Sequence, residues 1–329
     1  MASISRSSDL DHSFSQSFGL VTDPGNISRS WQRCRQAGLT PELATGHAPH
    51  FTGAQLRAAS ERRATLMIQA RPVIEYIYSQ IKDSGCIMLL SDENGYLLES
   101  AGDTEFCTRA AQVALQPGAC WAEDARGTNA IGTALIEGRP IVVNGPEHYL
   151  RHNSFLSCAA APLVEPGGKL LGVIDISCDT RGHHPHTFGL VRAAAQMIEN
   201  RIFEITFLRH MKLRFHLSST FLGSVMEGAL ALSEDGRVLG ANRSGFEMLG
   251  LTEHDIGKRE FAELFDMSLR ELLDLNRQAQ GRPISLHLRK GETLYLSVEK
   301  VHMPLLRRLP SATQTPKTDA LQELDSGDA

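Results

Sequence analysis

The stretch LSCAAAPLVEPGGKLLGVIDISCDTRGHHPHTFGLVRAAAQMIENRIFEITFL, residues 156–208, decides the fold class. Two apolar runs, Leu156–Val164 and Lys169–Ser177, flank the turn Pro166-Gly167-Gly168, and short apolar runs around such a turn are typical of paired β-strands. A helical pattern of about 28 residues then starts near Thr187. Strands that lead directly into a long helix predict an α+β domain.

Upstream segments extend this domain. Cys86–Ser91 and Tyr96–Ser100 read as hairpin strands across an acidic Asn-Gly turn, and Pro140–Asn144 reads as a further strand. Two helices are expected before the hairpin: Ser28–Gly38, and a longer one from near Thr52 to Ile81 that is kinked or divided at Pro72. Two more are expected after it, over Phe106–Ala114 and over Gly127–Glu137. In the last of these, Thr128 is the expected N-cap and Gly138 the residue after the helix.

Residues 220–302 repeat this organisation on a smaller scale. Four strands are expected there: Ala229–Ser233, Val238–Ala241, Ile284–Leu288 and Thr293–Lys300, with helical segments from Asn242 to Ala279. No convincing fifth strand can be placed. The predicted fold class is therefore α+β, with two antiparallel-sheet domains joined by a long helix.

Composition excludes several classes of protein. The 329 residues are 42% hydrophobic and 22% charged, with a net charge of −5, which disfavours direct contact with nucleic acid. No segment has the roughly 18–20 uninterrupted apolar residues of a membrane span, and the N-terminus shows no signal peptide, so a cytoplasmic protein is expected. The cysteines never form CxxC, which favours reduced thiols over a disulfide framework or a zinc site; they are Cys34, Cys86, Cys107, Cys120, Cys158 and Cys178.

Motifs for catalysis are not found. The sequence contains no phosphate-binding loop, GxSxG, HExxH or GxGxxG. The cluster His183-His184-Pro185-His186 reads as a solvated turn rather than a metal site, and His148 and His152, four residues apart on an expected short helix, lack a third ligand. His254 and His287 are expected at the surface rather than on haem. The prediction is a protein without enzymatic activity, metal or cofactor.

The segment WAEDARGTNAIGTALIEGRP, residues 121–140, is the first candidate for a binding site. Its small residues let a helix backbone approach a neighbour closely. Thr128 and Asn129 at the helix start, with Thr133 one turn later, direct polar groups toward one spot, and Trp121 offers an apolar wall. We expect these four residues to bind a small polar ligand. Tight packing of the helix on a sheet explains the pattern equally well.

Asp175 is the second candidate. It interrupts the apolar run Leu170–Ile176, which reads as a buried central strand. A buried carboxylate needs partners, and Arg126, Arg139 or helix-start N–H groups are the candidates. Asp175 is either a fifth ligand-binding residue or one half of a structural salt bridge.

The long helix carries an apolar stripe that includes Val191, Ile198 and Leu208. One face can pack on its own sheet while the rest pairs with a second helix, so a homodimer is expected, with the helix carrying a signal between the domains.

Four segments carry a family resemblance: SRSWQRCRQAG (28–38), GTNAIGTALIEGRPIVVNGPEHYLRHNSFLSCAAAPL, LLGVIDISCDTRGHHPHTFGLVRAAAQMIENRIFE and LGSVMEGALALSEDGRVLGANRSG. They resemble the N-terminal sensory half of sigma-54-dependent transcriptional activators of the acetoin- and dihydroxyacetone-catabolism regulator type. The resemblance covers about residues 28–305 and is most specific through 121–205.

The resemblance implies a GAF domain followed by a PAS-like domain. We therefore divide the chain into an N-terminal arm and short helix (1–50), a GAF-like sensor domain (51–205), a PAS-like domain (206–305) and a linker or tail (306–329). In such regulators the GAF domain senses a small metabolite or a partner protein and controls an AAA+ ATPase and a helix-turn-helix. Neither of these two is recognised in this sequence, so the chain is expected to be a sensory fragment, a truncated gene product or a free-standing regulator that acts through a partner.

Two other functions stay open. The chain can be a dimerisation or docking regulator without a ligand. It can also be a thiol enzyme on a GAF scaffold, such as a methionine-sulfoxide reductase that uses Cys86, Cys120 and Cys158, although cysteines in apolar strands are usually inert.

Overall fold

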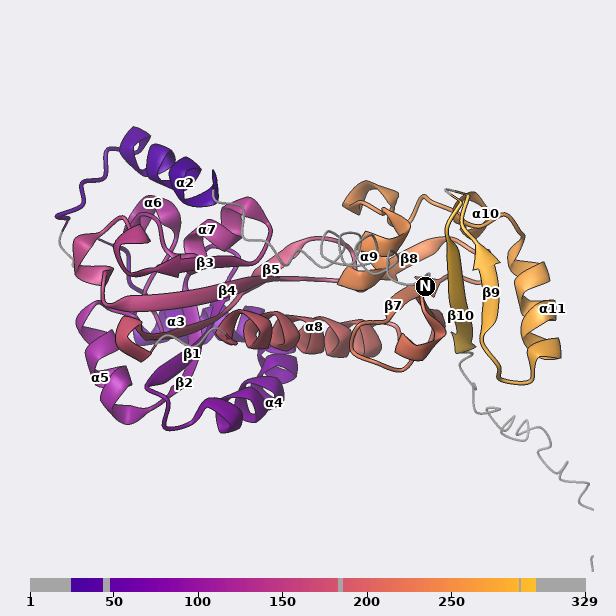
Figure 1. The fold of residues 1–329 in the computed structure, drawn as a ribbon, viewed down its shortest axis with the longest axis horizontal. Coiled ribbons are helices and arrows are strands. Elements are labelled where there is room, and N and C mark those ends of the chain that lie inside the picture. Colours follow the sequence, from indigo (N-terminus) through magenta and orange to yellow (C-terminus); the bar gives the residue numbers. More distant parts are fainter. Residues whose placement is uncertain (1–24, 44–47, 183–185, 290, 300–329) are drawn as a thin grey trace, which may run out of the picture.

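The computed structural model describes residues 25–43, 48–182, 186–289 and 291–299 and places them in two sheet-bearing domains (Figure 1). The expectations for the first arm residues, for His183, His184 and Pro185 of the histidine cluster, and for the tail concern residues outside these ranges. No helix within them has the length and apolar character needed to cross a membrane.

The first domain is built on a five-stranded antiparallel sheet in the order β2-β1-β5-β4-β3. Its strands are β1 (Cys86–Asp92), β2 (Leu97–Gly102), β3 (Ile141–Asn144), β4 (Leu156–Val164) and β5 (Leu170–Asp179). The central strand β5 pairs with β1 on one side and β4 on the other. Its residues 172–178 are all buried, which confirms the prediction of a buried central strand.

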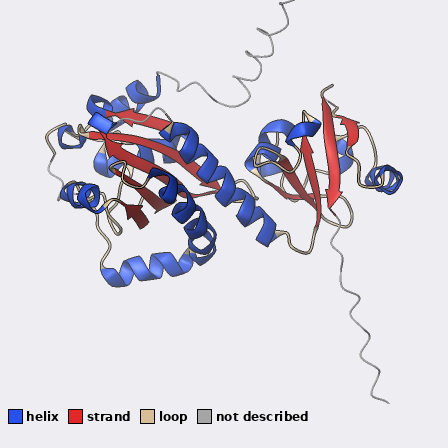
Figure 2. Ribbon diagram, turned by 60° about the horizontal axis from the view of Figure 1, so that its bottom comes forward, coloured by secondary structure: helices blue, strands red, loops and turns tan. Residues whose placement is uncertain are grey.

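Helices cover both faces of this sheet (Figure 2). One face packs on α4 (Ala64–Ile81) and α8 (Thr187–Thr206). The other face packs on α5 (Thr104–Gln112) and α7 (Ala130–Glu137). The short helix α6 (Glu123–Arg126) contacts α7, and α2 (Gly25–Gln36) contacts both α6 and α7. We call the face of the sheet that packs on α5 and α7 the α7 face.

The helix expected from Thr52 to Ile81 is divided, but at a different residue. Thr52 caps α3 (Gly53–Arg62) through a capping box with Gln55, and the break falls at Arg63. Pro72 lies inside α4. It is on the exposed side of that helix, where water can solvate the carbonyl oxygen that loses its amide partner.

The second domain also has a five-stranded antiparallel sheet, in the order β8-β7-β6-β10-β9. Its strands are β6 (Met211–His216), β7 (Gly228–Leu232), β8 (Val238–Ala241), β9 (Ile284–His287) and β10 (Thr293–Glu299), and its helices are α9 (Arg243–Leu249), α10 (Phe261–Leu264) and α11 (Leu269–Ala279). The fold class, α+β with two antiparallel-sheet domains joined by a long helix, is confirmed.

The fifth strand is where the sequence interpretation was wrong. α8 ends at Thr206 after 20 residues, and Met211–His216, which had been assigned to the end of the helix, forms the central strand β6. That strand pairs with β7 and β10. Two ladders of backbone hydrogen bonds outweigh a helical pattern that the local sequence only weakly favours.

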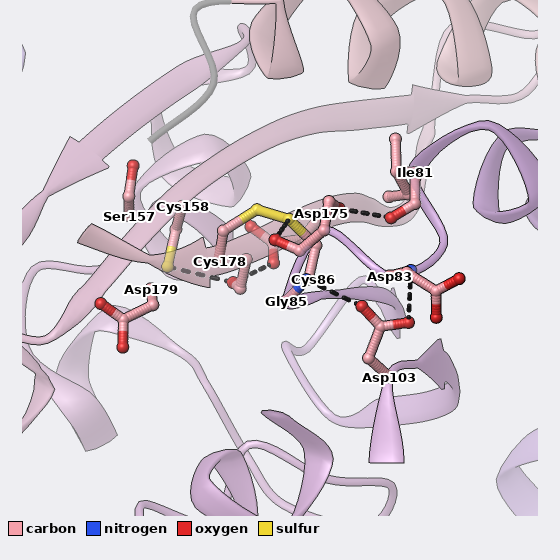
Figure 3. The surroundings of a disulfide bond; sticks show 12 residues. Ile81, Asp83, Gly85, Cys86, Asp103, Ser157, Cys158, Asp175, Cys178 and Asp179 are labelled. Atoms are coloured by element: carbon pink, nitrogen blue, oxygen red, sulfur yellow. Dashed lines mark hydrogen bonds between the residues drawn. A yellow bond between two sulfur atoms is a disulfide. The ribbon is translucent and has the colours of Figure 1, made fainter. Parts of the chain in front are cut away.

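The structure also corrects the expectation that every cysteine is a free thiol. Cys86 at the start of β1 and Cys178 near the end of β5 lie opposite each other with their Cα atoms 4.2 Å apart, and they form a disulfide (Figure 3). The two residues are 92 positions apart in sequence, so their spacing gives no sign of this register. The free cysteines are Cys34, Cys107, Cys120 and Cys158.

This disulfide predicts the result of thiol labelling. We expect alkylation of the denatured, unreduced protein to modify four of its six cysteines, as counted by mass spectrometry, and all of them after reduction. The control Cys86→Ser should leave every remaining cysteine reactive without reductant. Complete labelling of the unreduced wild type would show that the bond does not form.

Candidate functional site

The start of α7 is fixed by Asn129, not by Thr128 as expected. The Asn129 side chain accepts a hydrogen bond from Gly132 N at 2.8 Å and donates to the carbonyl oxygens of Trp121 at 3.0 Å and Gly127 at 2.8 Å. Asn129 is 1% exposed. Its amide is therefore used by the chain itself, as an N-cap that joins three backbone segments.

Gly132 explains why this helix is rich in small residues. A Cβ atom at this position would lie 2.5 Å from the backbone nitrogen of Glu123, closer than any real contact. The absence of a side chain lets α7 pack directly on α6. The close backbone approach expected from the sequence is confirmed at this glycine.

The hydroxyls of Thr128 and Thr133 meet the N-terminal helix α2. Ser30 of α2 donates to Glu123 Oε2 at 2.5 Å and lies 2.6 Å from Thr128 Oγ1. Thr133 Oγ1 donates to the same carboxylate oxygen at 2.9 Å. All four side chains are buried. Two residues predicted to bind a ligand thus hold a segment of their own chain.

Arg33 completes this cluster. Its guanidinium donates to both oxygens of Glu123, at 2.6 and 3.0 Å, and to Glu137 at 2.9 Å. The hydrogen bond to Glu123 raises the pKa of Arg33 above its usual value. Sequence reasoning missed Ser30, Arg33 and Glu123, although all three lie within or beside the family-specific segments. We refer to Ser30, Arg33, Glu123, Thr128 and Thr133 as the α2 latch.

The α2 latch makes a prediction for Ser30. We expect Ser30→Ala to lower the free energy of unfolding by about 1–2 kcal/mol, because Glu123 and Thr128 each lose a buried hydrogen bond. Urea denaturation measures this change. The matched control is Ser28→Ala, since Ser28 is exposed on the same helix, and it should change stability by less than about 0.5 kcal/mol. Equal effects of the two variants would contradict the latch.

Trp121 lies on the α7 face and is 1% exposed. Its Nε1 donates to the carbonyl oxygen of Ala114 at 2.9 Å, so the indole N–H is also satisfied internally. The guanidinium carbon of Arg126 lies 5.6 Å from the centre of the indole ring. That Trp121 forms an apolar wall for a ligand stays a prediction.

Asp175 points to the α7 face from the middle of β5, opposite Leu89 on β1 and Ala160 on β4. It is 1% exposed. Its Oδ2 accepts a hydrogen bond from Ser177 at 2.6 Å, whereas Oδ1 has no partner among the described residues. Burial raises the pKa of Asp175 to about 7.

The partners expected for Asp175 were wrong. Arg139 bonds to Asn26 and Glu137 instead, and Arg126 stacks on Trp121. The hydroxyl of Ser177, two residues away on the same strand face, takes their place beside the free thiol of Cys158. A neutral hydroxyl cannot compensate a buried carboxylate as an arginine would, which is why the pKa of Asp175 rises.

The histidines and cysteines were the candidates for a metal site or a thiol enzyme. His148 directly follows one short turn and His152 lies inside another, so the two do not share a helix. No group of three or more metal-ligating side chains occurs in the described part of the chain. Burial raises the pKa of the free thiols of Cys34, Cys107, Cys120 and Cys158. Such thiols are poor nucleophiles.

Comparison with known proteins places residues 20–200 in the family model described as MimR, N-terminal domain. The chain is 36% identical over 176 residues to the acetoin dehydrogenase operon transcriptional activator AcoR of Bacillus subtilis, covering 54% of this chain and 29% of that protein. It is 33% identical over 319 residues to the acetoin catabolism regulatory protein of Cupriavidus necator, covering 92% of this chain and 47% of that protein.

The solved structure of the Escherichia coli DhaR(N)–DhaL complex contains a similar fold. The match covers 84% of this chain and all of that chain, with a TM-score of 0.54 and 16% sequence identity. At this identity the similarity supports the fold alone. The chain spans less than half the length of the two activators above.

Proposed function

The chain belongs to the MimR N-terminal domain family, and from this premise we propose that it is the non-enzymatic, signal-receiving part of a transcriptional regulator. The family resemblance inferred from the sequence is confirmed. In this proposal residues 51–205 form a GAF-like domain that receives a small polar metabolite or a regulatory protein. Residues 206–305 form a PAS-like domain that receives the altered state.

The observation that carries this proposal is a buried link between the two domains. Glu199 of α8 is 2% exposed and accepts hydrogen bonds from Val164 N in β4 at 2.8 Å and from Arg243 in α9 at 2.6 Å. Arg243 also donates to the carbonyl oxygen of Pro162 in β4 at 2.9 Å. A shift of β4 or α8 would therefore move the hydrogen-bond partners of Arg243 in the second domain, and signal transfer between the domains requires such a connection.

A thermal-shift screen tests the sensing step. We expect at least one compound in a panel of small diols, ketones, aldehydes and carboxylates to raise the melting temperature of the full chain, because a ligand that binds only the folded state stabilises it. The same compound should lose its effect when Asp175 is replaced by Asn. A panel without any hit, together with monomeric behaviour and no bound regulatory protein, would overturn the proposal.

A docking regulator without a small ligand is the second candidate. It is favoured by one feature of the site: the polar groups of Thr128, Asn129 and Thr133 are already bonded within the chain. In this version a homodimer or a partner protein supplies the signal. Light scattering of the purified chain, with and without the screened compounds, separates a constitutive dimer from one that responds to ligand.

A further inference from the structure

Arg126 is a buried cation without a buried acid. It ends α6 and is 2% exposed. Within the described residues no carboxylate oxygen lies within 4.0 Å of its guanidinium, in contrast to Arg33 and Arg243. A buried charge normally has a counter-ion, because desolvation without one is costly. Burial accordingly lowers the pKa of Arg126.

The hydrogen bonds of Arg126 leave much of the guanidinium available. Nε donates to the carbonyl oxygen of Cys120 and Nη1 to that of Val113, each at 3.4 Å. These distances are longer than the 2.7–3.2 Å typical of such bonds. A guanidinium has five N–H donors in a planar fork, and one side of this fork is held against the ring of Trp121.

Next to Arg126 lies a short turn that carries unpaired polar atoms. Tyr149 N, three residues before His152, donates to the carbonyl oxygen of Thr128, two residues after Arg126, at 3.2 Å, so this turn lies near Arg126. Burial, and after it the positive charge of Arg126, lower the pKa of His152. Nε2 of His152 is buried without a partner. The following residue, Asn153, is 0% exposed, and neither its amide oxygen nor its amide nitrogen has a partner in the described part of the chain.

The α7 face of the sheet presents two more such atoms. Ser91 and Asp175 lie on adjacent strands, with Leu89 opposite Asp175 and Val173 opposite Ser91. Because side chains alternate along a strand, both point to the same face as Leu89 and Val173, which pack in one cluster with Trp121. Ser91 Oγ and Asp175 Oδ1 are buried and have no partner within the described ranges.

These groups share one requirement. Folded proteins pair most of their buried polar atoms, yet here a cation, an amide, an imidazole, a hydroxyl and a carboxyl oxygen stay incompletely bonded in the layer around Trp121. The cation calls for a negative charge, and the planar guanidinium fork matches a carboxylate. The amide of Asn153 and the side chains of Ser91 and Asp175 can form hydrogen bonds with a second polar group on the same ligand.

We infer that this layer binds a small organic carboxylate that also carries a hydroxyl or oxo group, with Arg126 holding the carboxylate and Asn153 and Asp175 available to the second group. The inference rests on the proposed sensing function and names the class of metabolite. The sequence predicted Arg126 only as a candidate partner for the carboxylate of Asp175. The structure gives it a separate role.

Calorimetric titration of the full chain with matched probes tests the assignment. We expect lactate or pyruvate to bind at least roughly tenfold more tightly than lactamide, because the amide lacks the charge that Arg126 recognises. Arg126→Gln should lose this preference. The control Arg181→Gln should keep it, since Arg181 is 79% exposed and pairs with Asp179.

The outcomes separate the two proposals. If lactamide or a neutral diol binds as tightly as the carboxylates, or if Arg126→Gln binds them unchanged, the carboxylate assignment is wrong while metabolite sensing stands. If no probe of either class binds, both the assignment and metabolite sensing fail, and only docking remains. If Arg126→Gln does not fold, the comparison of lactate with lactamide on the wild type still decides the question.

Discussion

Arg243→Met is expected to destabilise the protein by about 3–5 kcal/mol, because it leaves the carboxylate of Glu199 buried without its cation. Glu199 is 2% exposed, and Arg243 is 21% exposed. The guanidinium donates to both Glu199 oxygens, at 2.6 and 3.1 Å. Water therefore has little access to replace the lost partner. Urea denaturation followed by circular dichroism measures the change.

Two further variants make this test specific. Arg237→Met removes an ion pair with Asp235, but both side chains are more than half exposed, so we expect a loss below about 1 kcal/mol. Replacing Glu199 by Gln in the Arg243→Met background should recover part of the stability, because the uncompensated charge is then removed. If Arg243→Met costs no more than Arg237→Met, the buried link between the domains is contradicted.

Asp175→Asn is expected to stabilise the protein at pH 8 and to have little effect at pH 4. Burial raises the pKa of Asp175 from 3.8 to about 7, so the folded state holds this proton more tightly than the unfolded state. The contribution of the group to stability is therefore fully present below pH 4 and is lost as the pH rises to about 7. Above pH 7 the loss is constant and reaches at most about 4 kcal/mol.

Measurement of the free energy of unfolding at several pH values between 4 and 8 checks this sign. The wild type should lose stability across this interval relative to Asp175→Asn. Asp103→Asn is the matched control with the opposite sign. Burial alone would raise the pKa of Asp103, but hydrogen bonds from Asp83 N, Gly85 N and Tyr78 lower it. That variant should therefore lose most stability at neutral pH. Parallel wild-type and Asp175→Asn curves would contradict a buried, neutral Asp175.

Local patterns were sufficient for most of the elements. The apolar runs and the Pro-Gly-Gly turn predicted β4 and β5 close to their observed bounds, and Gly138 ends α7 in the left-handed conformation expected of it. Met211–His216 was misplaced because its residues fit a helix as well as a strand. Only its pairing with β7 and β10 selects the strand.

The candidate site was predicted in part. The burial of Trp121 and Asp175 on one face of the sheet agrees with the interpretation of that segment. Their binding of a ligand remains a prediction. Thr128 and Thr133 are engaged by Ser30, about a hundred residues earlier in the chain. A hydrogen bond over such a separation leaves no trace in local spacing, and the same holds for the disulfide of Cys86 and Cys178.

The sequence by itself determined the family, the α+β class and the position of most helices and strands, because backbone preferences and the period of apolar side chains act over a few neighbouring residues. The tertiary structure alone decided which buried polar groups find partners. Glu123 obtains Arg33, Glu199 obtains Arg243, and Arg126 obtains no acid among the described residues. These outcomes depend on which distant segments meet in space, and the free energy of a buried charge depends on that meeting far more than on its neighbours in the chain.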